Sequence, residues 1–141
     1  MDSHDLSRFV EAQRDVYANA LLEITRGCKE SHWMWFVFPQ LVGLGQSAMA
    51  QRYGISGVGE ARAYLAHPVL GPRLEACAEA ALGVEGRTAR EIFGRPDDRK
   101  LQSCATLFAM IAPPGSVFER LLAKYYHAER DEQTLRLLAS G

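Results

Sequence analysis

The chain of 141 residues has few of the features that mark disulfide-bonded, metal-binding, secreted or membrane proteins. Its three cysteines, Cys28, Cys77 and Cys104, include no CxxC pair, so neither a disulfide framework nor a zinc ribbon is expected. The four histidines are far apart and form no HExxH motif, and we expect no metal and no cofactor. No apolar run approaches the roughly 20 residues that span a bilayer, and the polar start lacks the apolar region of a secretory signal. We therefore expect a cytoplasmic protein with reduced thiols.

Strong charge of either sign is also missing. The net charge of −1 and the pI near 6.4 give no overall attraction to nucleic acid or to an anionic membrane, so neither partner is expected. The content of 48% hydrophobic and 23% charged residues is that of a soluble globular protein, and 141 residues fit one domain. We expect a single domain over residues 1–141, in which residues 1–5 form a flexible N-terminus. Among sixteen basic residues only Lys29, Lys100 and Lys124 are lysines.

Strand signals are scarce, whereas helix signals recur along the whole chain. Val16, Ala20 and Ile24 repeat at helical spacing, and Gly27 follows where a C-cap glycine is typical. The pattern predicts an all-α, compact multihelical domain of about eight short helices. They are expected in a segment behind Asp15, at 47–53, 60–66 and 69–82, in a segment behind Thr88, and at 100–112, 116–127 and 132–138.

The densest motif is the aromatic block, residues 29–40, which reads KESHWMWFVFPQ and contains both tryptophans. Its aromatic and β-branched residues suit a strand, but a lone strand has nothing to pair with. We interpret residues 33–38 as a short helical turn that Ser31 caps and Pro39 ends. In such a turn His32, Trp35 and Phe36 share one face, while Trp33 and Val37 point into the core.

The polar residues of the block make it a candidate ligand site. Trp35 beside His32 can form a wall for a planar ligand, and Lys29 or Gln40 can bind a polar or anionic group. The alternative is that both tryptophans are core residues and that His32 bonds a backbone carbonyl. The following glycines, at 43 and 45, resemble a phosphate loop only superficially, because both standard phosphate-loop motifs are missing.

A second polar cluster lies at residues 97–106. Lys100, Ser103 and Thr106 are three apart and make a polar stripe on an otherwise apolar helix. Asp97 and Asp98 suit the N-terminus of that helix, where one of them can act as the cap. The functional alternative places Asp98, or Asp97, opposite His32 across a cleft as an acid–base pair.

These motifs together resemble a known bacterial family, the domain of unknown function 1810, some members of which carry the label calpastatin. The resemblance extends from Leu6 to about Leu138 and rests on the following groups: Arg8-Phe9, Ala12-Gln13, Gly27-Cys28-Lys29, the block from His32 to Gln40, Gly43 to Gly45, Glu60-Ala61, Tyr64 to Pro68, Leu70-Gly71, Arg73-Leu74, Phe93-Gly94, Asp97-Asp98 and Lys100-Leu101. The family implies a compact multihelical fold and no established activity. It often has two serines where this chain has Ser103-Cys104. The calpastatin label has no physical basis here, since calpastatins are disordered and this chain has regular apolar periodicity.

Three functional hypotheses stay open at this stage. The first is a site for a small, nucleotide-like or anionic ligand, in a cleft walled by the aromatic block and by residues 97–106. The second is a protein-interaction module that uses the same block without catalysis. The third is a hydrolase or glycohydrolase, in which His32 and Asp98 transfer protons. The best ligand-binding candidates are Lys29, His32, Trp35, Gln40, Lys100 and Ser103.

Overall fold

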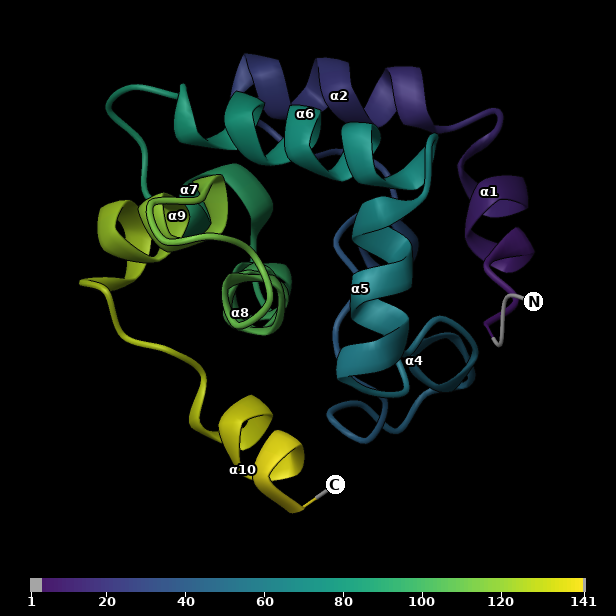
Figure 1. The fold of residues 1–141 in the computed structure, drawn as a ribbon. Helices are drawn as coiled ribbons and strands as arrows, with labels where there is room; N and C mark the ends of the chain where they lie inside the picture. The colour runs from purple at the N-terminus through teal and green to yellow at the C-terminus, as the bar shows by residue number, and fades with distance from the viewer. Residues whose placement is uncertain (1–3, 141) are drawn as a thin grey trace.

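The computed structural model describes residues 4–140 as a single all-helical domain, which confirms the predicted fold class (Figure 1). In this part of the chain there are ten helices, two more than the expected eight, and no strand. A lone bridge joins Leu41 to Ile55. The helices are α1 (Ser7–Gln13), α2 (Tyr17–Arg26), α3 (Met34–Val37), α4 (Ala48–Arg52), α5 (Val58–Ala66), α6 (Leu70–Leu82), α7 (Ala89–Phe93), α8 (Asp97–Ala109), α9 (Val117–Tyr126) and α10 (Glu132–Ser140).

Local capping signals place most helix ends correctly. Gly27 ends α2 in the left-handed conformation at φ 77°, which favours glycine. Thr88 and Glu91 form a capping box at the start of α7, the helix expected behind Thr88, and Ser47 caps α4. Asp131 accepts a hydrogen bond from the Thr134 amide at the start of α10. These short polar contacts bind amides that the first turn of a helix leaves unpaired.

Three expectations about helix ends are wrong. Trp33, not Ser31, is the N-cap of α3, because the Ser31 hydroxyl donates to Glu23 instead. Helix α8 begins at Asp97 and ends at Ala109, whereas residues 100–112 were expected. Pro96 is its N-cap residue and no side chain caps it, so neither Asp97 nor Asp98 has the capping role. Both aspartates lie in the first turn, where their charge still suits the helix dipole.

Helix α8 is the centre of the domain and is packed against α5, α7, α9 and α10. Its apolar side chains Leu101, Ala105, Leu107 and Phe108 are fully buried. Helices α2 and α6 lie side by side along one edge, and α9 packs on both α6 and α8. The terminal helix α10 stands apart from α9 at the end of an extended segment and contacts α8 (Figure 1). This leaves the start of α8 facing the segment that follows the aromatic block.

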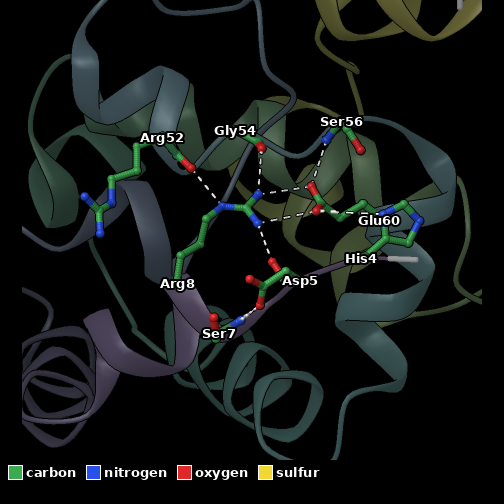
Figure 2. Close-up of polar contacts among 8 residues, drawn as sticks. All are labelled: His4, Asp5, Ser7, Arg8, Arg52, Gly54, Ser56 and Glu60. Atoms are coloured by element: carbon green, nitrogen blue, oxygen red, sulfur yellow. Dashed lines mark hydrogen bonds and ion pairs between the residues drawn. The ribbon is translucent and has the colours of Figure 1, made fainter. Parts of the chain in front are cut away.

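A hydrogen-bonded network around Arg8 joins the N-terminal segment to the rest of the fold (Figure 2). The Arg8 guanidinium pairs with Glu60 at 3.1 Å and donates to the carbonyls of Arg52, Gly54 and Asp5. Glu60 also accepts from the Ser56 amide, and the His4 ring lies 3.9 Å from it. His4 and Asp5 thus contact the fold, while residues 1–3 of the expected flexible N-terminus lie outside the described residues. Each charge of this network has partners, which is typical of a structural role.

Within residues 4–140, none of the helices has the length and apolar character needed to cross a membrane.

Candidate functional site

The loop that leads into the aromatic block is held by one carboxylate, Glu23 on α2. Its Oε1 accepts from the amides of Glu30 and Ser31 at 2.8 and 2.9 Å and from the Trp33 indole at 2.9 Å. Its Oε2 accepts from the Ser31 hydroxyl at 2.6 Å. Burial alone would raise the pKa of Glu23, but these hydrogen bonds outweigh it and lower the pKa to about 2. Glu23 is therefore an ionised anchor that sets the position of the block.

Most of the block is core. Trp33 and Val37 are buried, as the helical interpretation predicted, and Phe36 and Phe38 are buried with them. Trp35 is half-buried, and His32 is exposed. The block therefore presents little aromatic surface, and its last residue, Gln40, is half-buried where the chain leaves the core.

Lys29, Asp97 and Lys100 form a chain of charges between the block and α8. The Lys29 ammonium lies 2.9 Å from Asp97 Oδ2, and the Lys100 ammonium lies 3.4 Å from Asp97 Oδ1. Each lysine also lies over a tryptophan ring: Lys29 is 5.0 Å from the centre of Trp33 and Lys100 is 4.7 Å from that of Trp35. Such cation–π contacts favour a fixed position of the ammonium. Lys29 is inside the protein, with a side chain 7% exposed, whereas Lys100 is 21% exposed and reaches the surface.

Lys100 lies in the wall of a cleft with a volume of about 310 Å³, which we call the Lys100 cleft. Three segments far apart in the sequence form it: the chain after the aromatic block, the first half of α8 and the start of α10. The lining residues are Gln40, Leu44, Gly45, Pro96, Arg99, Lys100, Ser103, Asp131 and Gln133. They include two cations, one carboxylate and two carboxamides, so the lining carries a formal charge of +1. A few convergent polar groups in a hollow of this size are typical of small-molecule sites.

The Lys100 cleft brings together Gln40, Lys100 and Ser103, three of the six residues that the sequence selected as ligand-binding candidates. Lys29 and Trp35 do not line it but support Lys100, one through Asp97 and the other through its ring. His32 does not line it either. The Ser103 hydroxyl donates to the Arg99 carbonyl at 3.1 Å and keeps its acceptor capacity.

Asp98 is not among the residues that line the Lys100 cleft. Its carbonyl accepts a hydrogen bond from the Tyr126 hydroxyl on α9, and burial together with the Asp98 charge raises the Tyr126 pKa. The Asp98 Oδ1 atom is buried and lacks a hydrogen-bond partner among residues 4–140. In the same part of the chain no hydrogen bond or ion pair joins Asp98 to His32. The structure thus gives the proposed acid–base pair no direct contact.

Cys104, which stands where the family often has a second serine, points into the core. Cys104 is buried, and burial raises its pKa well above the ordinary value, as it raises that of Cys77 to about 12. A thiol in this environment is a packing group rather than a nucleophile. Of the Ser103-Cys104 pair, only Ser103 therefore offers a hydroxyl group, and it lines the cleft.

The sequence did not select Arg99, Asp131 or Gln133, which also line the Lys100 cleft. Arg99 adjoins Lys100, so a search for paired cations would have found it. Asp131 precedes the expected helix at 132–138, where an aspartate is typical of a helix cap, and nothing local to Gln133 marks it. A larger hollow of about 370 Å³ between Leu41, Val58 and Leu137 has no charged lining residue, which makes it a weaker candidate. No three His, Cys, Asp or Glu side chains gather in a metal-binding group within residues 4–140.

The fold and the cleft define a small all-helical domain with one polar hollow beside its central helix. The chain belongs to the family described as protein of unknown function DUF1810, whose model matches residues 3–138, and the resemblance noted from the motifs is thereby confirmed. It is also similar to the conserved hypothetical protein Rv1873 from Mycobacterium tuberculosis, known from a crystal structure. The two are 54% identical with a TM-score of 0.94, and the match covers 96% of each chain. No curated protein matches the chain.

Proposed function

We propose that the protein binds a small anionic ligand, such as a nucleotide, in the Lys100 cleft. The observation that carries the proposal is that Arg99 and Lys100 line one hollow together with Gln40 and Ser103. Arginine and lysine are the side chains that proteins use for phosphate and carboxylate groups. The carboxamide and the hydroxyl add hydrogen-bonding groups that can orient the rest of the ligand.

The surroundings of Lys100 support this proposal. Its ammonium is held between Asp97 and the Trp35 ring, so less side-chain entropy is lost when an anion binds. Asp97 does not cancel the charge of the cleft, because the buried Lys29 pairs with the same carboxylate. Two lysines share one aspartate, and the surplus positive charge lies on the lysine that reaches the surface.

The two other hypotheses receive less support. An interaction module needs exposed aromatic anchors, and Trp33, Phe36 and Phe38 are buried in the core. A hydrolase that uses His32 and Asp98 needs both groups near one substrate, but His32 is exposed whereas one carboxylate oxygen of Asp98 is buried. Both stay predictions, to be tested by activity and partner assays.

Thermal unfolding with a panel of inorganic phosphate, nucleoside monophosphates and small carboxylates tests the proposal. A ligand at 100 times its Kd should add about 2.7 kcal/mol of stability, a rise in Tm on the order of 10 °C for a domain of this size. Lys100→Met and Arg99→Met should each weaken binding roughly tenfold or more, since a hydrogen bond to a charged group contributes about 1.5–3 kcal/mol.

Arg120→Met is the matched control, because Arg120 is an exposed arginine on α9 that pairs with Glu79 away from the cleft. It should leave the ligand shift unchanged. The proposal is wrong if no anion shifts the Tm, or if the Arg120 variant loses the shift as fully as the Arg99 variant.

A further inference from the structure

The Lys100 cleft contains a carboxylate that a simple anion site would not need. Asp131, at the start of α10, lines the same hollow as Arg99 and Lys100. Its negative charge opposes the binding of any ligand that offers only a phosphate or carboxylate group. The presence of this residue therefore restricts which anionic ligands fit.

Asp131 is fixed in the cleft wall by buried hydroxyl groups. Its amide donates to the Thr106 hydroxyl at 2.9 Å, and its Oδ2 accepts from the Thr134 amide at 3.0 Å and from the Thr134 hydroxyl. Thr106 and Thr134 are both fully buried. Among residues 4–140, no side chain or amide donates to the other oxygen, Oδ1. Asp131 thus brings to the cleft lining a carboxylate that is held in place through one oxygen and has acceptor capacity left on the other.

An ionised carboxylate can only accept hydrogen bonds, so its complement on a ligand is a donor, either a hydroxyl or an ammonium group. A ligand ammonium would also meet Arg99 and Lys100 in the same hollow, and the repulsion disfavours it. Hydroxyl groups carry no charge and meet no such repulsion. The two carboxamides, Gln40 and Gln133, can both donate to and accept from hydroxyl groups.

We infer that the Lys100 cleft takes a phosphorylated, hydroxyl-bearing ligand of the sugar-phosphate class, and that Asp131 is the residue that selects it. This inference rests on the proposed function, since it assumes that Arg99 and Lys100 bind the phosphate. The carboxylate then accepts from sugar hydroxyl groups and discriminates against phosphates without them. A ribose phosphate, free or as part of a nucleotide, satisfies both halves of the cleft.

Isothermal titration with three probes tests this selectivity: inorganic phosphate, n-butyl phosphate and ribose 5-phosphate. The wild-type protein should bind ribose 5-phosphate at least tenfold more tightly than butyl phosphate, a difference of about 1.4 kcal/mol. Asp131→Asn should bind inorganic and butyl phosphate several-fold more tightly, because the repulsion is lost, and should lose most of the tenfold preference. Asparagine retains an oxygen that can cap α10, so this variant should fold. If it is unstable, Asp131→Ser repeats the test, because serine is also a preferred cap residue.

Glu132→Gln is the matched control. Glu132 follows Asp131 in the chain and carries the same charge, but its side chain is exposed and does not line the cleft. It should change neither the affinities nor the preference. Equal binding of butyl phosphate and ribose 5-phosphate by the wild type overturns the inference and leaves the proposed function standing. So does a Glu132 variant that behaves like Asp131→Asn. If none of the three probes binds, the inference fails, and if no anion of the thermal panel shifts the Tm either, the proposed function fails with it.

Discussion

Replacing Glu23 tests the anchor that positions the aromatic block. Glu23→Gln keeps the size and one carbonyl oxygen of the side chain, so the amides of Glu30 and Ser31 and the Trp33 indole retain an acceptor. The charge is lost, and the Ser31 hydroxyl must turn to accept from the new amide. Glu23→Ala removes every acceptor and leaves the Trp33 indole N–H unpaired in the core.

The lowered pKa of Glu23 sets how much stability the protein should lose when this side chain is replaced. The Glu23 pKa falls from its ordinary value of 4.5 to about 2 in the folded state. At about 1.4 kcal/mol per pKa unit, the ionised side chain stabilises the folded state by up to about 3.4 kcal/mol. The group is nearly buried, so solvent screens little of this. We expect Glu23→Ala to cost about 3–5 kcal/mol and Glu23→Gln about half as much.

Urea unfolding between pH 7 and pH 2 gives the assay. Because the pKa of Glu23 is lower in the folded than in the unfolded chain, its contribution is complete above about pH 4.5 and is lost as the pH falls toward 2. In Glu23→Gln that part of the pH dependence should disappear, so the wild-type and variant curves converge at low pH. A variant that stays less stable by the same amount at pH 7 and at pH 2 would refute the reasoning, since its loss would not come from the charge.

Three further predictions concern other parts of the fold and are tested by urea or thermal unfolding. Gly71→Ala should cost at least about 2 kcal/mol, because the added Cβ overlaps the Leu65 carbonyl. Gly83→Ala should be neutral or slightly stabilising, because its added Cβ makes only ordinary van der Waals contacts and the φ at Gly83 is helical. Thr88→Ala should cost about 1 kcal/mol, because it breaks the capping box of α7. Lys29→Met should cost about 1.5–3 kcal/mol, and combining it with Asp97→Asn should cost less than the two single changes together. These predictions are contradicted if the two glycine variants lose equal stability or if Thr88→Ala is as stable as the wild type. They are also contradicted if the costs of Lys29→Met and Asp97→Asn simply add.

Much of the fold follows from signals that act over four residues or fewer. Gly27, Ser47 and the Thr88 capping box mark helix ends, because the amides and carbonyls they bind are next to them in the chain. The start of α8 was missed because an acidic residue suits the cap and the first turn equally well. Ser31 was misassigned because its preferred partner, Glu23, lies eight residues away on another helix.

The candidate site depends on contacts that no local pattern contains. Lys29 meets Asp97 across 68 positions, and Gln40 faces Lys100 across 60. The sequence marks these residues because polar groups on apolar segments need partners, but it does not show which of them meet. The sequence could not show that the start of α10 forms the third side of the cleft. Asp131 caps this helix, and the capping role alone explains an aspartate at this position.

The aromatic block acts on the cleft through its buried part more than through its surface. Glu23 and the core fix Trp33, and Trp33 with Asp97 fixes Lys29. Lys29 in turn neutralises the aspartate that would otherwise be paired with Lys100 alone, so Lys100 keeps its charge available toward the cleft. Hence a substitution in the buried part of the block should weaken anion binding in the cleft, although it alters no lining residue. If the block only stabilised the fold, such a substitution would leave anion binding unchanged. His32 lies outside this chain of contacts, and substituting it should leave binding in the Lys100 cleft unchanged.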